Sequence, residues 1–204
     1  MTARFLAMAA LAFAAASTTA QAADPRYPNW PCTQAKVPEI SLAAVWSGPA
    51  LDDAETQWKN DAKVTALVSK LSARKTPMEE AEKSVKEFLS GSAADKSANA
   101  KLLFAGLFDT LNAQRSQVMI GLERVSRKQR DAAEKIREET IQLQALQGAA
   151  SRDDTKVDAL SNELIWKTRI FEDRNKVVRF VCEVPTAIDQ RLFALGRVIQ
   201  QEME

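Results

Sequence analysis

Two cysteines, Cys32 and Cys182, are the residues of this 204-residue chain whose type and spacing most clearly suggest chemistry. They stand far apart, so the Cys-x-x-Cys spacing that lowers the thiol pKa in redox proteins is missing. In an oxidising compartment, two distant cysteines favour an intramolecular disulfide. We therefore predict a Cys32–Cys182 disulfide, and a redox pair is the alternative.

The absence of histidine restricts the remaining chemistry. Zinc and copper sites, c-type haem attachment, Glu-x-x-His di-iron sites and serine or cysteine triads all use imidazole in their usual forms. The sequence therefore predicts no metal ligands, no cofactor-binding residues and no catalytic residues.

Neighbouring carboxylates do not change this prediction. The pairs Asp52-Asp53, Glu79-Glu80 and Asp153-Asp154 fall where helices are expected to begin, and acidic residues stabilise helix N-termini. General acid–base catalysis needs carboxyl groups that converge in a cleft, and no pattern indicates one. The few glycines form no phosphate-binding loop.

The N-terminus resembles a secretory signal peptide. Arg4 precedes an apolar run from Phe5 to Ala16, and Ala20-Gln21-Ala22 fits the small-x-small cleavage pattern. The apolar run is shorter than the roughly 20 residues of a membrane span, and no other segment is more apolar. We expect cleavage after Ala22, a periplasmic location and no transmembrane segment in the mature chain.

Charge argues against nucleic acid as the partner. The chain has 28 basic and 27 acidic residues, and the signal peptide contains one of the basic ones. The mature chain is therefore neutral, whereas phosphate binding needs a surplus of Lys and Arg on one face. A local basic stretch from Arg124 to Arg130 is followed by interleaved acids and bases, which is typical of a solvated helix face. Peripheral contact with an anionic membrane is a weaker alternative.

These features must be positioned by two long helices near the C-terminus. Positions taken at alternating spacings of three and four residues form two series, which we call tracks. One track runs from Phe104 to Leu146 and the other from Val157 to Ile199, and ten of the thirteen positions in each are apolar. Chance would give about six, so the pattern indicates a coiled-coil seam. The short connection around Ala150 makes the helices antiparallel. The expected pairing places Leu122 near Val178.

Two shorter helices are expected before the hairpin. Apolar spacing predicts one continuous helix over 52–73. Thr76 and Glu79 predict a capping box at the start of a second helix, which ends at Gly91. Pro185 should kink or restart the last helix.

The predicted fold is all-α, with a long antiparallel coiled-coil hairpin, a small helical bundle at its base and an extended proline-rich N-terminal arm. The predicted segments are a signal peptide (1–22), the arm (23–49) and the helical bundle (50–204), whose projecting stalk spans about 125–174. The arm contains five prolines and two tryptophans, so it should run extended along the helices. Cys32 should fasten it there.

The candidate functional residues are those that depart from the heptad pattern. Five polar residues interrupt the tracks, and such residues commonly fix the register of a coiled coil. These are Arg115, Gln129, Glu139, Lys167 and Arg174. Ile141, Ile165 and Trp166 fall outside the seam on the stalk, and exposed apolar residues of this kind suggest partner binding. Self-association, or a register in which Trp166 is buried, is the alternative.

We therefore expect a non-enzymatic periplasmic scaffold or adaptor that binds a protein of the cell envelope through the hairpin. A periplasmic holdase-type chaperone is the main alternative. An enzyme or ligand-binding protein of unknown type is a third.

Overall fold

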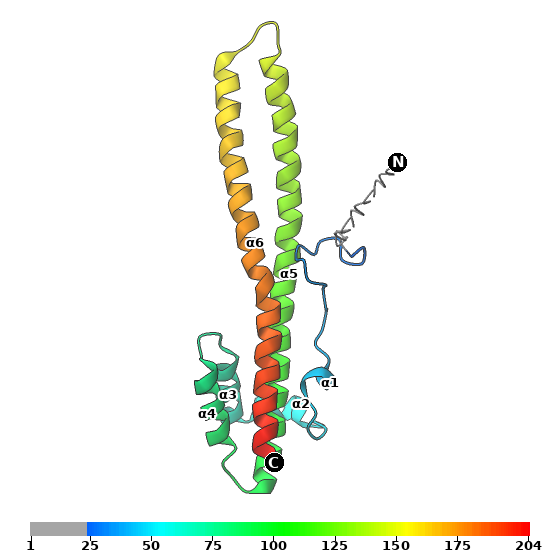
Figure 1. The fold of residues 1–204 in the computed structure, drawn as a ribbon, viewed down its shortest axis with the longest axis vertical. Coiled ribbons are helices and arrows are strands. Elements are labelled where there is room, and N and C mark those ends of the chain that lie inside the picture. The colour runs from blue at the N-terminus through cyan, green and yellow to red at the C-terminus, as the bar shows by residue number, and fades with distance from the viewer. Residues whose placement is uncertain (1–23) are drawn as a thin grey trace, which may run out of the picture.

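Two long antiparallel helices dominate the fold (Figure 1). The computed structural model describes residues 24–204, and the predicted signal peptide (1–22) lies outside these residues. The described part is all-α and contains no strand. Its elements are α1 (Leu42–Val45), α2 (Ala54–Gln57), the 3-10 helix η1 (Trp58–Asn60), α3 (Ala62–Ser72), α4 (Met78–Phe88), α5 (Ala93–Gln147) and α6 (Asp154–Met203).

The long helices begin and end at capping residues. The Ser92 hydroxyl accepts a hydrogen bond from Asp95 N at the start of α5, and Gly148 follows its last residue. The Asp153 carboxylate caps α6 by accepting a hydrogen bond from Lys156 N. With 55 residues, α5 extends for roughly 80 Å at 1.5 Å per residue.

The register of the hairpin agrees with the predicted pairing about Ala150. Leu122 and Val178, which were expected to lie close together, line the same groove. Gln129 Nε2 donates to Phe171 O at 3.1 Å and to Asn175 Oδ1 at 3.0 Å. Burying this amide costs little, since both of its hydrogen-bond partners are polar atoms of α6.

The hydrophobic core lies at one end of the hairpin, where α3 and α4 pack against α5 and α6 (Figure 1). Trp46 stacks on Phe104 with their ring centroids 4.2 Å apart. The buried residues of this core stop at Leu111 on α5 and resume at Ile188 on α6. We call this end of the molecule the base; the remainder of the hairpin projects from it without cover from α1–α4 (Figure 1).

Two glycines allow close packing in the base. A Cβ at Gly106 would lie 2.6 Å from Val68 Cγ2, and a Cβ at Gly196 would lie 2.7 Å from Val45 O. Any larger residue would push these neighbours away from the long helices. Glycine is therefore required where α3 and α1 approach α5 and α6.

The arm, Asp24–Pro49 in the structure, runs along the outside of the hairpin (Figure 1). It is joined to α6 by the predicted disulfide between Cys32 and Cys182, and the Gln34 amide donates to Cys182 O. Lys36 forms an ion pair with Glu123 of α5 at 2.7 Å.

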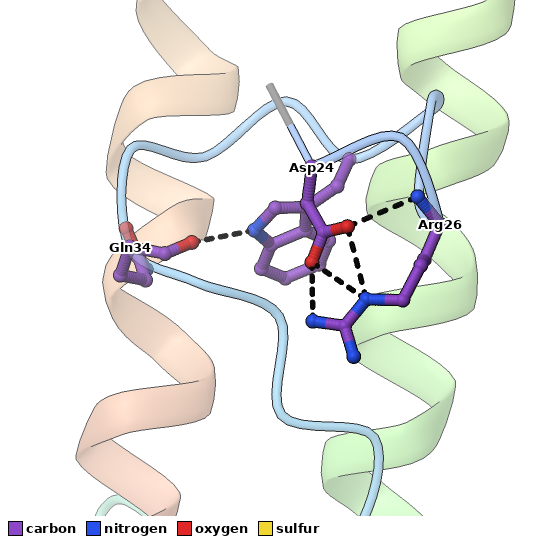
Figure 2. A network of polar contacts seen from close by, with 4 residues as sticks. Asp24, Arg26 and Gln34 are labelled. Atoms are coloured by element: carbon purple, nitrogen blue, oxygen red, sulfur yellow. Dashed lines mark hydrogen bonds and ion pairs between the residues drawn. The ribbon is translucent and has the colours of Figure 1, made fainter. Parts of the chain in front are cut away.

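Turns within the arm hold its first residues in place. Asp24 accepts hydrogen bonds from the backbone and guanidinium of Arg26, and Trp30 Nε1 donates to Gln34 O at 2.7 Å (Figure 2). The hydrogen bonds from the Arg26 guanidinium, and to a smaller extent the one from its backbone N–H, lower the pKa of Asp24 below its ordinary value.

The prediction of one continuous helix over 52–73 is wrong. The chain breaks at Asp61, whose backbone is extended and whose carboxylate accepts hydrogen bonds from Lys63 N and Val64 N. An aspartate that caps the following turn competes with continuation of the preceding helix.

The predicted capping box at Thr76 and Glu79 is also wrong. Thr76 Oγ1 donates to Lys70 O at 2.8 Å, so this hydroxyl satisfies the end of α3 instead of the start of α4. Pro77 occupies the N-cap position of α4 without a side-chain hydrogen bond. Pro185 neither ends nor restarts the last helix, because α6 continues through it.

Candidate binding surface on the hairpin

The three residues predicted to bind a partner are exposed on the projecting part of the hairpin. The exposed fractions are 60% for Ile141, 66% for Ile165 and 62% for Trp166. They do not form one cluster. Ile165 lines a shallow cavity with Thr140, whereas Trp166, the next residue, is rotated about 100° around α6.

Trp166 belongs instead to an apolar stripe along the outside of α6. Ile170 follows it by four residues, Val177 by eleven and Phe180 by fourteen, and these spacings place all four on one helix face. Val177 and Phe180 are exposed, Phe180 by 76%. We call Trp166, Ile170, Val177 and Phe180 the α6 stripe. Ile170 is half-buried, and the exposed Asp173 falls on the same face between Ile170 and Val177. Large apolar side chains exposed at helical spacing suggest a contact surface.

A groove between α5 and α6 lies next to the α6 stripe. It has a volume of 640 Å³. Its walls are mainly aliphatic, from Val118, Leu122 and Val125 of α5 and Val177, Val178 and Val181 of α6.

A second cavity of 240 Å³ continues this groove toward the tip of the hairpin. Ala132 and Ile136 of α5 face Ile170 and Phe171 of α6 in it, and Arg174 lines both cavities. We call the two cavities together the hairpin groove. Since Val177 and Ile170 belong to both the stripe and the groove, the two features form one continuous surface.

The hairpin groove lies on the side of the seam opposite the arm. The arm contacts α5 through Glu123 and Arg130, whose guanidinium donates to Pro28 O at 2.8 Å. Gly121 and Lys128, which line the groove, each precede one of these residues by two positions and so point about 200° away around the helix. At the level of Glu123 and Arg130 the arm therefore covers one side of the hairpin and leaves the groove side open.

The charged side chains that line the hairpin groove are all cationic. They are Lys128, Lys135, Lys167 and Arg174. Lys167 forms ion pairs with Glu139 at 2.5 Å and Glu163 at 2.7 Å, and these hydrogen bonds raise its pKa.

The other three cations have no such partner. Within residues 24–204, Lys128, Lys135 and Arg174 form no ion pair at 4 Å or less. The groove thus combines an apolar floor with an uncompensated positive rim.

Arg174 differs in this respect from the other seam exceptions. Arg115, only 4% exposed, donates from Nε to Asp189 Oδ1 at 2.7 Å and from Nη1 to Pro38 O at 3.2 Å. Gln129 and Glu139 likewise have polar partners on α6. These three polar residues fit a structural role in joining segments, whereas Arg174 faces the open groove.

The carboxylate pairs lie at separate places in the fold. Asp52 pairs with Lys101, Glu80 pairs with Lys70, and Asp153 caps α6. Residues 24–204 contain no group of three or more acidic or cysteine side chains arranged to hold a metal ion. No helix among these residues combines the length and apolarity needed to cross a membrane.

The sequence predicted that Trp166 lies outside the seam, and its exposure agrees, but Val177, Phe180 and the groove were not predicted. A second apolar repeat beside the seam could have indicated the stripe, since Ile170 and Val177 each precede a seam residue. Comparison with protein-family models, with curated proteins and with solved structures finds no match to this chain.

Proposed function

We propose that this protein is a non-enzymatic scaffold or adaptor of the bacterial periplasm, which docks another protein of the cell envelope on the open side of its hairpin. The observation that supports the proposal most directly is the α6 stripe beside the hairpin groove. Exposed large apolar side chains gathered on one helix face, here interrupted by Asp173, are typical of interaction sites.

The proposed location rests on the N-terminal sequence and on the disulfide. Residues 1–22 have the pattern of a cleavable signal peptide, and structural disulfides persist mainly in oxidising compartments. We keep the proposed division into an arm (23–49) and a bundle (50–204), with a stalk of about 125–174. In this division the arm lies against one side of the hairpin as far as Arg130, near the start of the stalk, and would direct a partner at that level to the other side.

Site-specific crosslinking in intact cells tests the function. A photoreactive residue at position 166 should give one dominant crosslinked protein, and the variant Trp166→Ala should deplete that protein from affinity purifications by more than about five-fold, because buried tryptophans often dominate interface energies. Thr140→Ala is a matched control on the other side of the hairpin. If Trp166→Ala leaves the yield of the partner unchanged, the proposed stalk surface is wrong.

A holdase-type chaperone is the second candidate, since the same exposed stripe could grip unfolded clients. The two functions differ in their specificity. A holdase suppresses aggregation of unrelated proteins, such as thermally unfolded citrate synthase and reduced insulin, at stoichiometric ratios. An adaptor leaves their aggregation, measured by light scattering, unchanged.

A further inference from the structure

Gly121 indicates that another polypeptide backbone can approach the hairpin groove closely. It lies in the interior of α5, where glycine is unfavourable compared with alanine, and it lines the groove. A Cβ at Gly121 would meet no atom within 4 Å, in contrast to Gly106 and Gly196, where neighbouring atoms leave no room for one. Nothing within the described chain explains this glycine. A closely approaching backbone would, because glycine permits helix–helix contact at short range.

The charges of the hairpin groove indicate the polarity of the occupant. Lys128, Lys135 and Arg174 have no acidic partner among residues 24–204, although the mature chain as a whole is neutral. An occupant with acidic side chains along its edges would form charge-assisted hydrogen bonds with these cations. Its apolar face would lie on the aliphatic floor.

The length of the groove indicates the size of the occupant. Its α5 wall extends from Val118 to Ile136, which corresponds to about 27 Å of helix at 1.5 Å per residue. A helix of about 18 residues would match this length. It would present apolar residues at spacings of three and four to the floor, as in other helix-in-groove complexes.

We propose that the hairpin groove binds an acidic amphipathic helix of a partner protein, with Gly121 as the point of closest backbone approach and with Lys128, Lys135 and Arg174 as its charge contacts. The proposal rests on the proposed function, for which it names the recognition element of the partner. The helix together with α5 and α6 would form a three-helix assembly whose third position is empty in the isolated chain.

A second copy of this chain is a poorer occupant. Its α6 stripe contains Asp173, which pairs with Lys176 at 3.0 Å, and is bordered by Arg169 and Arg174, which form no ion pair within residues 24–204. Docking this face into the groove would bring the unpaired Arg169 and Arg174 against the cations of the groove, and its one acid, Asp173, already has a partner in Lys176. An anionic lipid satisfies the charges, but its acyl chains do not require glycine at position 121.

Binding of two matched peptides to the full mature chain, with its disulfide intact, tests the proposal. Both are 18-residue helical peptides with the same leucine stripe, and they carry either glutamate or lysine at every edge position. We expect fluorescence anisotropy to show at least ten-fold tighter binding of the glutamate peptide. Equal binding of the two peptides, or binding of neither, would overturn the proposal.

Variants locate the peptide in the groove. Gly121→Leu should weaken binding of the glutamate peptide at least ten-fold, while Ile120→Leu, one residue earlier on an exposed face, should leave it unchanged. The double variant Lys128→Glu/Lys135→Glu alters only side chains at the rim, so it tests the site independently of any loss of folding in Gly121→Leu. It should reverse the preference toward the lysine peptide. Unchanged preference in the double variant contradicts the proposed charge contacts.

Two further measurements separate the other occupants. Association with phosphatidylglycerol vesicles that abolishes peptide binding would identify a lipid site and overturn the proposal, as would a concentration-dependent dimer that is lost in Gly121→Leu. In cells, a photoreactive residue at Val125 should capture the same protein as one at position 166. If position 166 captures a partner and Val125 does not, the adaptor function stands and the groove proposal fails.

Discussion

Arg115 and Asp189 show how a charged residue is accommodated in an otherwise aliphatic seam. The guanidinium is buried, and it joins α5 to α6 through Asp189 and to the arm through Pro38 O. Burial raises the pKa of Asp189 above its ordinary value of about 4, and the neighbouring Arg115 offsets part of this effect. The ionised Asp189 therefore destabilises the fold through its burial and stabilises it through its attraction to Arg115, and the dependence of stability on pH shows which effect is larger.

We predict that the contribution of Asp189 to stability decreases as pH rises. A carboxyl group whose pKa is higher in the folded state binds its proton more tightly there, so its contribution is fully present below about pH 4 and is lost as pH rises through the raised pKa. Urea unfolding of the wild type and of Asp189→Asn between pH 3 and pH 7 measures it. The free energy of unfolding of the wild type relative to the variant should fall with pH. A relative rise would show that attraction to Arg115 outweighs burial.

Gly121 offers a second test at the scale of single residues. Gly121→Ala should raise the free energy of unfolding by about 0.5–1 kcal/mol, because alanine favours the helix and its Cβ has open space. Gly106→Ala is the matched control, and it should destabilise the protein since Val68 and Trp58 occupy the space. Thermal unfolding followed by circular dichroism compares them. Destabilisation by Gly121→Ala would reveal a contact of this glycine within the chain.

At the scale of elements, the long helices and their pairing could be predicted because the heptad pattern is a local repeat with a clear period. The break at Asp61 could not be predicted in the same way. Apolar residues continue at helical spacing across it, and the choice between helix and cap depends on a hydrogen bond from the Asp61 carboxylate to backbone N–H groups. The capping box at Thr76 was wrongly predicted for a similar reason, since the Thr76 hydroxyl donates to Lys70 O at the end of the preceding helix.

The candidate surface was predictable only in part. The heptad register places Ile141, Ile165 and Trp166 outside the seam, and the structure shows all three exposed. Both sides of a two-helix seam look equivalent in the sequence, however. Which side is open depends on the path of the arm, and that path depends on long-range contacts such as Lys36–Glu123 and the disulfide.

The disulfide should contribute strongly to the stability of the arm. Replacing both cysteines by serine, Cys32→Ser/Cys182→Ser, should lower the free energy of unfolding by up to about 4–5 kcal/mol, since the bond closes a loop of about 150 residues in the unfolded chain. Urea unfolding of the variant, and of the wild type with and without reductant, measures the loss. A reducing agent should have no effect on the variant, which serves as the control. Equal stability of variant and wild type would show that noncovalent contacts alone hold the arm.

At the scale of the whole molecule, the base should fold without the outer hairpin. Between Leu111 and Ile188 the described core has no fully buried member and only Val118 and Val184, both close to the base, as partly buried ones, so the tip contributes little to it. Replacing residues 134–166 by a four-residue Gly-Ser turn should lower the stability of the base by less than about 2 kcal/mol, as expected for a region that opens independently. Near-ultraviolet circular dichroism of the three remaining tryptophans, Trp46 and Trp58 in the base and Trp30 in the arm, reports on packing outside the deleted segment, and alkylation followed by mass spectrometry reports on the disulfide. Loss of the tryptophan signal would show that the hairpin and base fold as one unit.

The position of the disulfide also imposes an order in time. Ribosomes build the chain from its N-terminus, so Cys32 is made early and must wait for Cys182, 150 residues later, before the bond can close. By then all of α5 and more than half of α6 have been synthesised. The arm is thus locked onto a hairpin that is nearly complete, and covalent closure is a late step in maturation. Until the bond closes, only noncovalent contacts such as Lys36–Glu123 hold the arm against the hairpin.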